Sequence, residues 1–143
     1  MTGKTIMGLV AGITLLGLAA GAQANSDIQK ALDAGATPLT SDEIAERLTG
    51  KTVTFISAKS GDQFLVYYGE NNTTAGRKVG SDKTNVGFHA VNDRNQICLG
   101  WEGRDLPRLR CMDVLLIDGK MHKFKADGSL TGYISETADG NTT

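Results

Sequence analysis

The side chains best suited to chemistry in this chain are two cysteines, Cys98 and Cys111, and the arginines near them. If the cysteines pair across neighbouring antiparallel strands, Trp101 lies opposite Arg108 and Arg110 shares their face. An arginine on an apolar face needs a partner, such as an aromatic ring or an anion. We therefore predict that Trp101, Arg108 and Arg110 bind a small amphipathic or anionic ligand. A loop that places both arginines in water is the alternative.

The loop between the paired strands offers a second hypothesis. A disulfide at its base holds loop 102–108 in place, and such preorganisation lowers the entropy cost of binding a partner. Arg104, Leu106 and Pro107 are its candidate contact residues. The alternative function is therefore a protein-interaction or enzyme-inhibitor domain that binds an envelope protein through this loop. An ordinary solvated hairpin loop is the simpler interpretation of the same residues.

The motifs of common enzymes are absent from the sequence. His89 and His122 are the only histidines, and no carboxylate accompanies either in a recognisable pattern. Two cysteines without a histidine pair cannot complete a four-ligand zinc site. The net charge of −1 lacks the positive excess of a nucleic-acid binder. We therefore expect a non-enzymatic binding module with no metal, no cofactor and no nucleic-acid partner.

The first 24 residues have the pattern of a bacterial signal peptide. Lys4 precedes an uncharged apolar run over residues 6–20, and residues 22–24 (Ala-Gln-Ala) match a cleavage site. The run is shorter than the roughly 20 residues of a membrane span, and no second apolar run follows it. We expect a periplasmic or secreted monomer that begins at Asn25 and has no membrane span. An even cysteine count in such a protein favours a structural disulfide.

Two capping patterns predict two short helices before residue 51. Ser26 begins the first helix, and Gly35 ends it. Thr40 begins the second, which also carries a hydrophobic staple between Leu39 and Ile44.

From Lys51 onward the apolar period changes from 3.6 to 2, which predicts about eight strands. Their expected ranges are 52–58, 63–69, 77–80, 85–91, 96–102, 109–117, 121–125 and 130–135. Short connections without crossover helices favour an antiparallel arrangement. The predicted fold is mainly β, with N-terminal short helices followed by an up-and-down meander in a lipocalin-like small barrel or a curled sheet. The expected segments are a cleaved signal peptide (1–24), a linker with a short helix (25–36), one helix-plus-β domain (37–135) and a flexible tail (136–143).

The order of these features resembles that of a family of short exported proteobacterial proteins. The pattern comprises Pro38-Leu39-Thr40-x-Asp42-Glu43-Ile44, Gly50-x-Thr52-Val53, Cys98-Leu99-x-Trp101, Cys111, Asp118-Gly119, Phe124 and Gly128. That family is catalogued only as a domain of unknown function, number nine-nine-five. The resemblance covers roughly residues 37–135 and implies export, a helix-then-sheet order and the cysteine pair, but no activity. The architecture is also similar to that of small periplasmic barrel inhibitors of proteases or lysozyme.

Overall fold

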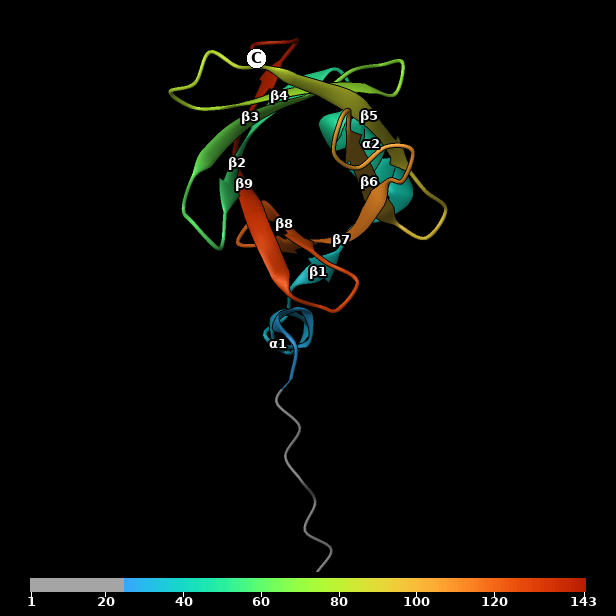
Figure 1. The fold of residues 1–143 in the computed structure, drawn as a ribbon. Coiled ribbons are helices and arrows are strands. Elements are labelled where there is room, and N and C mark those ends of the chain that lie inside the picture. The colour runs from blue at the N-terminus through green and yellow to red at the C-terminus, as the bar shows by residue number, and fades with distance from the viewer. Residues whose placement is uncertain (1–24) are drawn as a thin grey trace, which may run out of the picture.

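Eight strands follow one another around a closed antiparallel barrel in the computed structural model, which describes residues 25–143 (Figure 1). They are β2 (Lys51–Ser57), β3 (Gln63–Tyr68), β4 (Thr73–Lys78), β5 (Asn85–Val91), β6 (Gln96–Trp101), β7 (Arg110–Ile117), β8 (Lys120–Phe124) and β9 (Leu130–Asp139). Each strand pairs with the next, and β9 pairs with β2 to close the sheet. The predicted up-and-down meander is confirmed, and it forms a barrel. The predicted signal peptide lies outside the described residues.

The two predicted helices are present, and each begins at the predicted capping residue. They are α1 (Asp27–Asp33) and α2 (Ser41–Leu48). The Ser26 side chain accepts a hydrogen bond from the Gln29 N–H, and the Thr40 side chain accepts one from the Glu43 N–H. A ninth strand, β1 (Thr37–Pro38), connects the helices and pairs with the second half of β7. No helix of residues 25–143 has the length and apolar character needed to cross a membrane.

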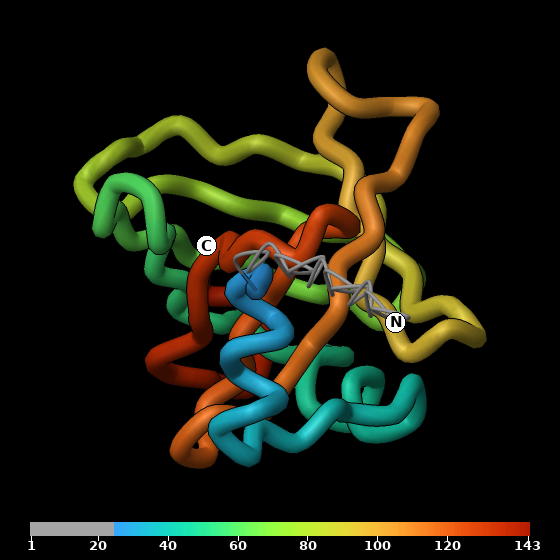
Figure 2. Tube along the Cα trace, turned by 90° about the horizontal axis from the view of Figure 1, so that it is seen from below, coloured from blue at the N-terminus to red at the C-terminus, as the bar shows by residue number. Residues whose placement is uncertain are grey.

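Helix α2 fills one end of the barrel. Leu39, Ile44 and Leu48 are buried, and they pack in one cluster with strand residues such as Val53 and Ile97. The predicted hydrophobic staple is therefore part of the core. Figure 2 shows α2 at one end of the barrel and the loop between β6 and β7 at the other. We call these the closed end and the open end.

Strand β4 begins four residues before the predicted strand. It covers Thr73–Lys78, whereas the predicted strand was 77–80. Its inward positions include Thr74 and Gly76, which are buried but carry little or no apolar surface. The strand therefore lacks the alternating apolar side chains by which the others were found.

The predicted flexible tail is a second correction, because β9 extends to Asp139. Lys51 is opposite Asp139 in the β2–β9 ladder. Beyond the strand, the Gly140 N–H donates to the Gly50 carbonyl at 2.9 Å, and the Thr52 hydroxyl donates to the Gly140 carbonyl at 2.6 Å. The backbone N–H and C=O groups along the edge of β2 need hydrogen-bond partners. The end of β9 provides them, although its side chains are polar.

Candidate ligand-binding cavity

The barrel contains a cavity of about 680 Å³, and every one of its eight strands contributes to the lining. The cavity also contacts the β4–β5, β6–β7 and β8–β9 connections. In an up-and-down barrel these three connections lie at the same end. The hydroxyl of Ser41 at the start of α2 donates to the Asn92 carbonyl in the β5–β6 turn, at the opposite end. The cavity therefore opens away from α2, at the open end.

The walls of the cavity combine apolar surface with an excess of positive charge. Six large apolar residues contribute: Phe55, Phe64, Val66, Leu99, Trp101 and Met112. Among the described residues in the lining, seven are basic and only Glu102 is acidic; the basic ones are Arg77, Lys78, Lys83, Arg104, Arg110, Lys123 and Lys125. A low-dielectric cleft lined by one sign of charge concentrates ions of the opposite sign. This lining suits a molecule with an apolar body and an anionic group.

Trp101 forms part of the wall, as the sequence analysis predicted, and a glycine on β4 makes room for its indole ring. A Cβ atom at Gly76 would lie 2.6 Å from Cη2 of Trp101. The indole therefore rests directly on the backbone of β4. This close approach explains why a strand of the barrel wall carries glycine at an inward position.

Arg110 is held at the cavity mouth by an acidic residue of the loop. Arg110 lies opposite Leu99, on the face predicted from the cysteine pair, and it lines the cavity. Its Nε lies 3.3 Å from Oδ1 of Asp105, which also contacts Arg104. Burial opposes ionisation of Asp105, but the Trp101 N–H and the two guanidinium groups outweigh it and lower the pKa of this carboxyl group. The Arg110 side chain is still 62% exposed, so this ion pair lies at the rim.

Arg108 does not occupy its predicted position opposite Trp101. The β6–β7 ladder ends at the pairing of Leu99 with Arg110, and Arg108 is exposed and outside the cavity lining. The backbone turns away at Trp101, whose carbonyl accepts the Asp105 N–H at 3.0 Å. The alternative that placed both arginines in water holds for Arg108, whereas Arg110 is at the mouth.

Of the other predicted loop residues, only Leu106 packs against the stem of the loop. Leu106 is partly buried, and its Cδ2 atom lies near Gly100 of β6. Arg104 lines the cavity mouth, whereas Pro107 is exposed. Loop 102–108 is therefore well braced, but only part of it faces solvent.

Lys123 is the site residue that the sequence analysis missed. It is only 4% exposed, and it lines the cavity from β8. Its Nζ atom donates to the Tyr68 hydroxyl at 3.2 Å and lies 4.4 Å from the centre of the Phe55 ring. Among the described residues, no carboxylate lies within ion-pair distance of Lys123. The sequence did contain a signal for Lys123. Side chains alternate along the predicted strand, so Lys123 lies on the same face as the apolar Met121.

The two histidines have structural surroundings. His89 points inward, where its ring meets Tyr68 edge-on at 5.2 Å and its Nδ1 donates to the Thr73 carbonyl at 2.9 Å. Burial lowers the pKa of His89, although this hydrogen bond opposes the shift, so the ring is neutral at pH 7. His122 stacks on Tyr133 at 5.3 Å. No group of three or more His, Cys, Asp or Glu residues within 25–143 could hold a metal ion.

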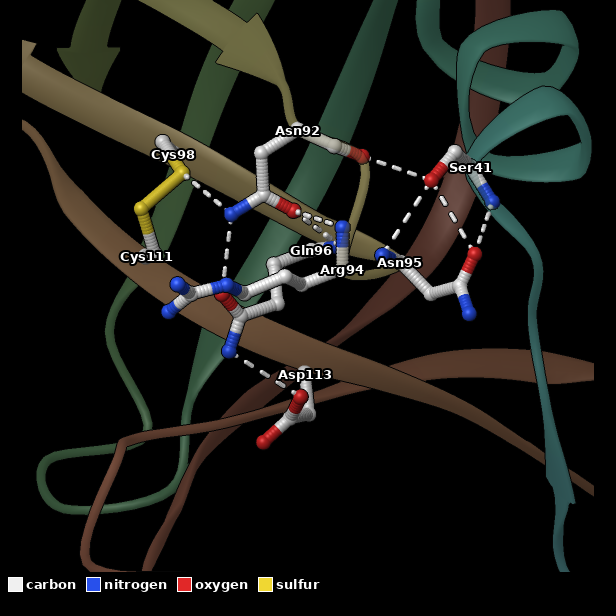
Figure 3. The surroundings of a disulfide bond; sticks show 8 residues. All are labelled: Ser41, Asn92, Arg94, Asn95, Gln96, Cys98, Cys111 and Asp113. Atoms are coloured by element: carbon white, nitrogen blue, oxygen red, sulfur yellow. Dashed lines mark hydrogen bonds between the residues drawn. A yellow bond between two sulfur atoms is a disulfide. The ribbon is translucent and has the colours of Figure 1, made fainter.

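Cys98 and Cys111 form the predicted disulfide, with Cα atoms 3.9 Å apart (Figure 3). Alternation along β6 and β7 places it on the face opposite Leu99 and Met112. Figure 3 shows the amide of Asn92 beside it, with Nδ2 3.6 Å from Cys98 Sγ. The bond therefore staples two neighbouring strands of the wall.

The chain matches no protein-family model, no curated protein and no solved structure at a significant level. The resemblance to the domain of unknown function stays a prediction.

Proposed function

We propose that this chain is a non-enzymatic binding module for a small amphipathic anion, exported to the periplasm or secreted after removal of residues 1–24. The signal-peptide pattern and the disulfide support this location, because such bonds persist in oxidising compartments. The volume of the cavity lies within the range of about 300–1,000 Å³ that small-molecule sites occupy.

The observation that carries this proposal is the imbalance of charge on an apolar lining. Seven basic residues and one acidic residue, among those described, line walls that also present Phe55, Phe64 and Trp101. Three of the basic groups already pair with carboxylates at the mouth, but a neutral apolar ligand leaves the others, including the buried Lys123, without a counter-ion. A small inorganic anion leaves the aromatic walls exposed to water. A molecule with both an alkyl or ring body and a carboxylate satisfies both requirements.

Tryptophan fluorescence tests this proposal directly, because Trp101 is the only tryptophan in the chain and lines the cavity. Dodecanoate, dodecanol and dodecylamine are titrated below their aggregation limits. We expect saturable binding of dodecanoate, binding of dodecanol that is about tenfold weaker or more, and no saturable binding of the amine. Equal binding of all three, or binding of none, would contradict the proposal.

A second candidate function is interaction with an envelope protein through loop 102–108. The loop projects at the open end (Figure 2), and the Asp105 contacts brace it while Pro107 and Arg108 stay exposed. A preorganised loop loses little entropy on binding. Capture of a purified envelope protein should be lost in Arg104→Ala and Leu106→Ala while dodecanol binding is kept. Capture that survives both substitutions would remove the loop from consideration.

A further inference from the structure

We propose that Lys123, held in place by the Tyr68 hydroxyl, forms an inner anion site, and that the carboxylate of an amphipathic ligand enters the barrel first. This inference rests on the proposed function and specifies its ligand as a carboxylate with an apolar tail. It also assigns the basic residues of the rim a different task from that of the buried lysine.

The position of Lys123 places the inner site at the floor of the cavity. Phe55, which its Nζ atom faces at 4.4 Å, lines the cavity. Tyr68, to which Nζ donates, is fully buried in the apolar cluster that continues to the closed end. The ammonium group therefore lies where the filled half of the barrel meets the empty half.

The surroundings of Lys123 provide no compensating negative charge. Its neighbours are the aromatic rings of Phe55 and Tyr68, and His89 beyond Tyr68 is neutral at pH 7. Among residues 25–143 no carboxylate reaches it. A buried ammonium without a counter-ion is unfavourable, and an anionic ligand removes this penalty. The empty volume beside the lysine is where that ligand fits.

Lys123 supplies the hydrogen-bond donors that a ligand in the cavity can reach, because Tyr68 is fully buried and outside the lining. The Tyr68 oxygen accepts from Lys123 and holds its ammonium group in place. An ammonium group carries three donor hydrogens, of which the Tyr68 contact uses one. The other two are available to the oxygens of a carboxylate.

The basic residues of the rim are less suited to select the charge of a ligand. Arg110 is already paired with Asp105, and Lys78 is paired with Asp62 at 2.9 Å. Their side chains are 62% and 51% exposed, and exposed pairs contribute little energy. The rim attracts anions toward the mouth, whereas the buried lysine distinguishes a carboxylate from a neutral head group.

The test compares the affinities of dodecanoate and dodecanol in wild type and Lys123→Met, followed through Trp101 fluorescence. We expect the wild type to prefer dodecanoate by about tenfold or more. Lys123→Met should lose that preference and bind dodecanol at least as well as the wild type does. Methionine fills a similar space without charge, so the variant should fold, and its melting temperature checks this. Tyr68→Phe should reduce the preference by a smaller factor, since it removes the hydroxyl that positions the Lys123 ammonium group.

Lys59→Gln is the matched control, because Lys59 is exposed and outside the cavity lining. It should keep the full preference for dodecanoate. A folded Lys123→Met variant that keeps the preference would overturn the inner site but leave the proposed function standing. Failure of both amphiphiles to bind wild type would instead overturn the proposed function.

Discussion

The closed and open ends of the barrel use the same strands for different purposes. At the closed end, Leu39, Ile44 and Leu48 fill the space between the strands. At the open end the same strands enclose a cavity of about 680 Å³ and present basic side chains. Tight packing at one end stabilises the fold, so the other end can keep empty volume and unpaired charge. Stability and binding should therefore respond to different substitutions.

The largest expected effect is a loss of stability at the closed end. Ile44→Ala should lower the free energy of unfolding by about 2–5 kcal/mol, because Ile44 is fully buried and its removal leaves a cavity. Urea unfolding measures this loss. The affinity for dodecanoate should stay within about twofold of wild type wherever the variant is folded.

Met112→Ala is the matched variant at the open end. Met112 is only partly buried and already borders empty space, so its truncation should cost less stability than that of Ile44. It should also weaken dodecanoate binding, since it removes apolar wall. Equal effects of the two variants on affinity would contradict the separation of the ends.

Removal of the disulfide should have the next largest effect, which should be on stability and not on ligand preference. Cys98→Ala combined with Cys111→Ala should cost about 3 kcal/mol, since the bond restricts a short loop of the unfolded chain. Thermal unfolding of the oxidised wild type and the double variant measures this. The preference for dodecanoate should survive, because Lys123 lies on β8. A variant that unfolds like wild type, or one that loses the preference, would contradict this assignment.

A smaller effect should appear in the pH dependence of stability. Burial lowers the pKa of His89 in the folded state, so the unfolded chain takes up a proton first as the pH falls. The contribution of the neutral ring to the free energy of unfolding is fully present above the pKa of the unfolded chain, near 6.5. It declines as the pH drops from there toward the folded pKa, by at most about 1.4 kcal/mol per pH unit.

Urea unfolding between pH 7.5 and 5.0 should show this decline, and His89→Gln should remove it. The window stays above the range in which carboxylates titrate. The lowered pKa values of Asp62 and Asp105 therefore do not contribute to the slope. A wild-type stability that is flat or rises toward pH 5.0 would show that His89 is not held neutral by burial.

The elements of the fold were predictable where local chemistry decides them. Ser26 and Thr40 cap their helices through bonds between neighbours in the sequence. Strand β4 and the end of β9 were missed for the opposite reason. Gly76 is inward because it makes room for Trp101, 25 positions away in sequence, and the tail pairs because β2 needs a partner. These contacts form between residues that are distant in the sequence, so the local spacing of apolar residues cannot predict them.

The site was predicted in part for the same reason. The register through Cys98 and Cys111 placed Arg110 correctly at the cavity, because the β6–β7 ladder continues to the pairing of Leu99 with Arg110. Trp101 lies beyond that ladder but also lines the cavity, because side chains alternate along β6. Arg108 lies beyond the point where Asp105 turns the backbone. Lys123 was on a predicted strand, but only closure of the barrel brings it beside Phe55 and Tyr68.

The smallest effect should come from a substitution at the rim of the cavity, and it should change the association rate of the ligand. Arg110→Gln should slow the association of dodecanoate by about two- to threefold at low salt and keep the preference over dodecanol. Stopped-flow Trp101 fluorescence measures the rate, and the difference should vanish near 1 M salt, where the screening length falls to about 3 Å. Arg94→Gln is the control, since Arg94 is exposed in the β5–β6 turn of the closed end. If Arg110→Gln abolished the preference for dodecanoate, the carboxylate would bind at the rim of the cavity and not at Lys123.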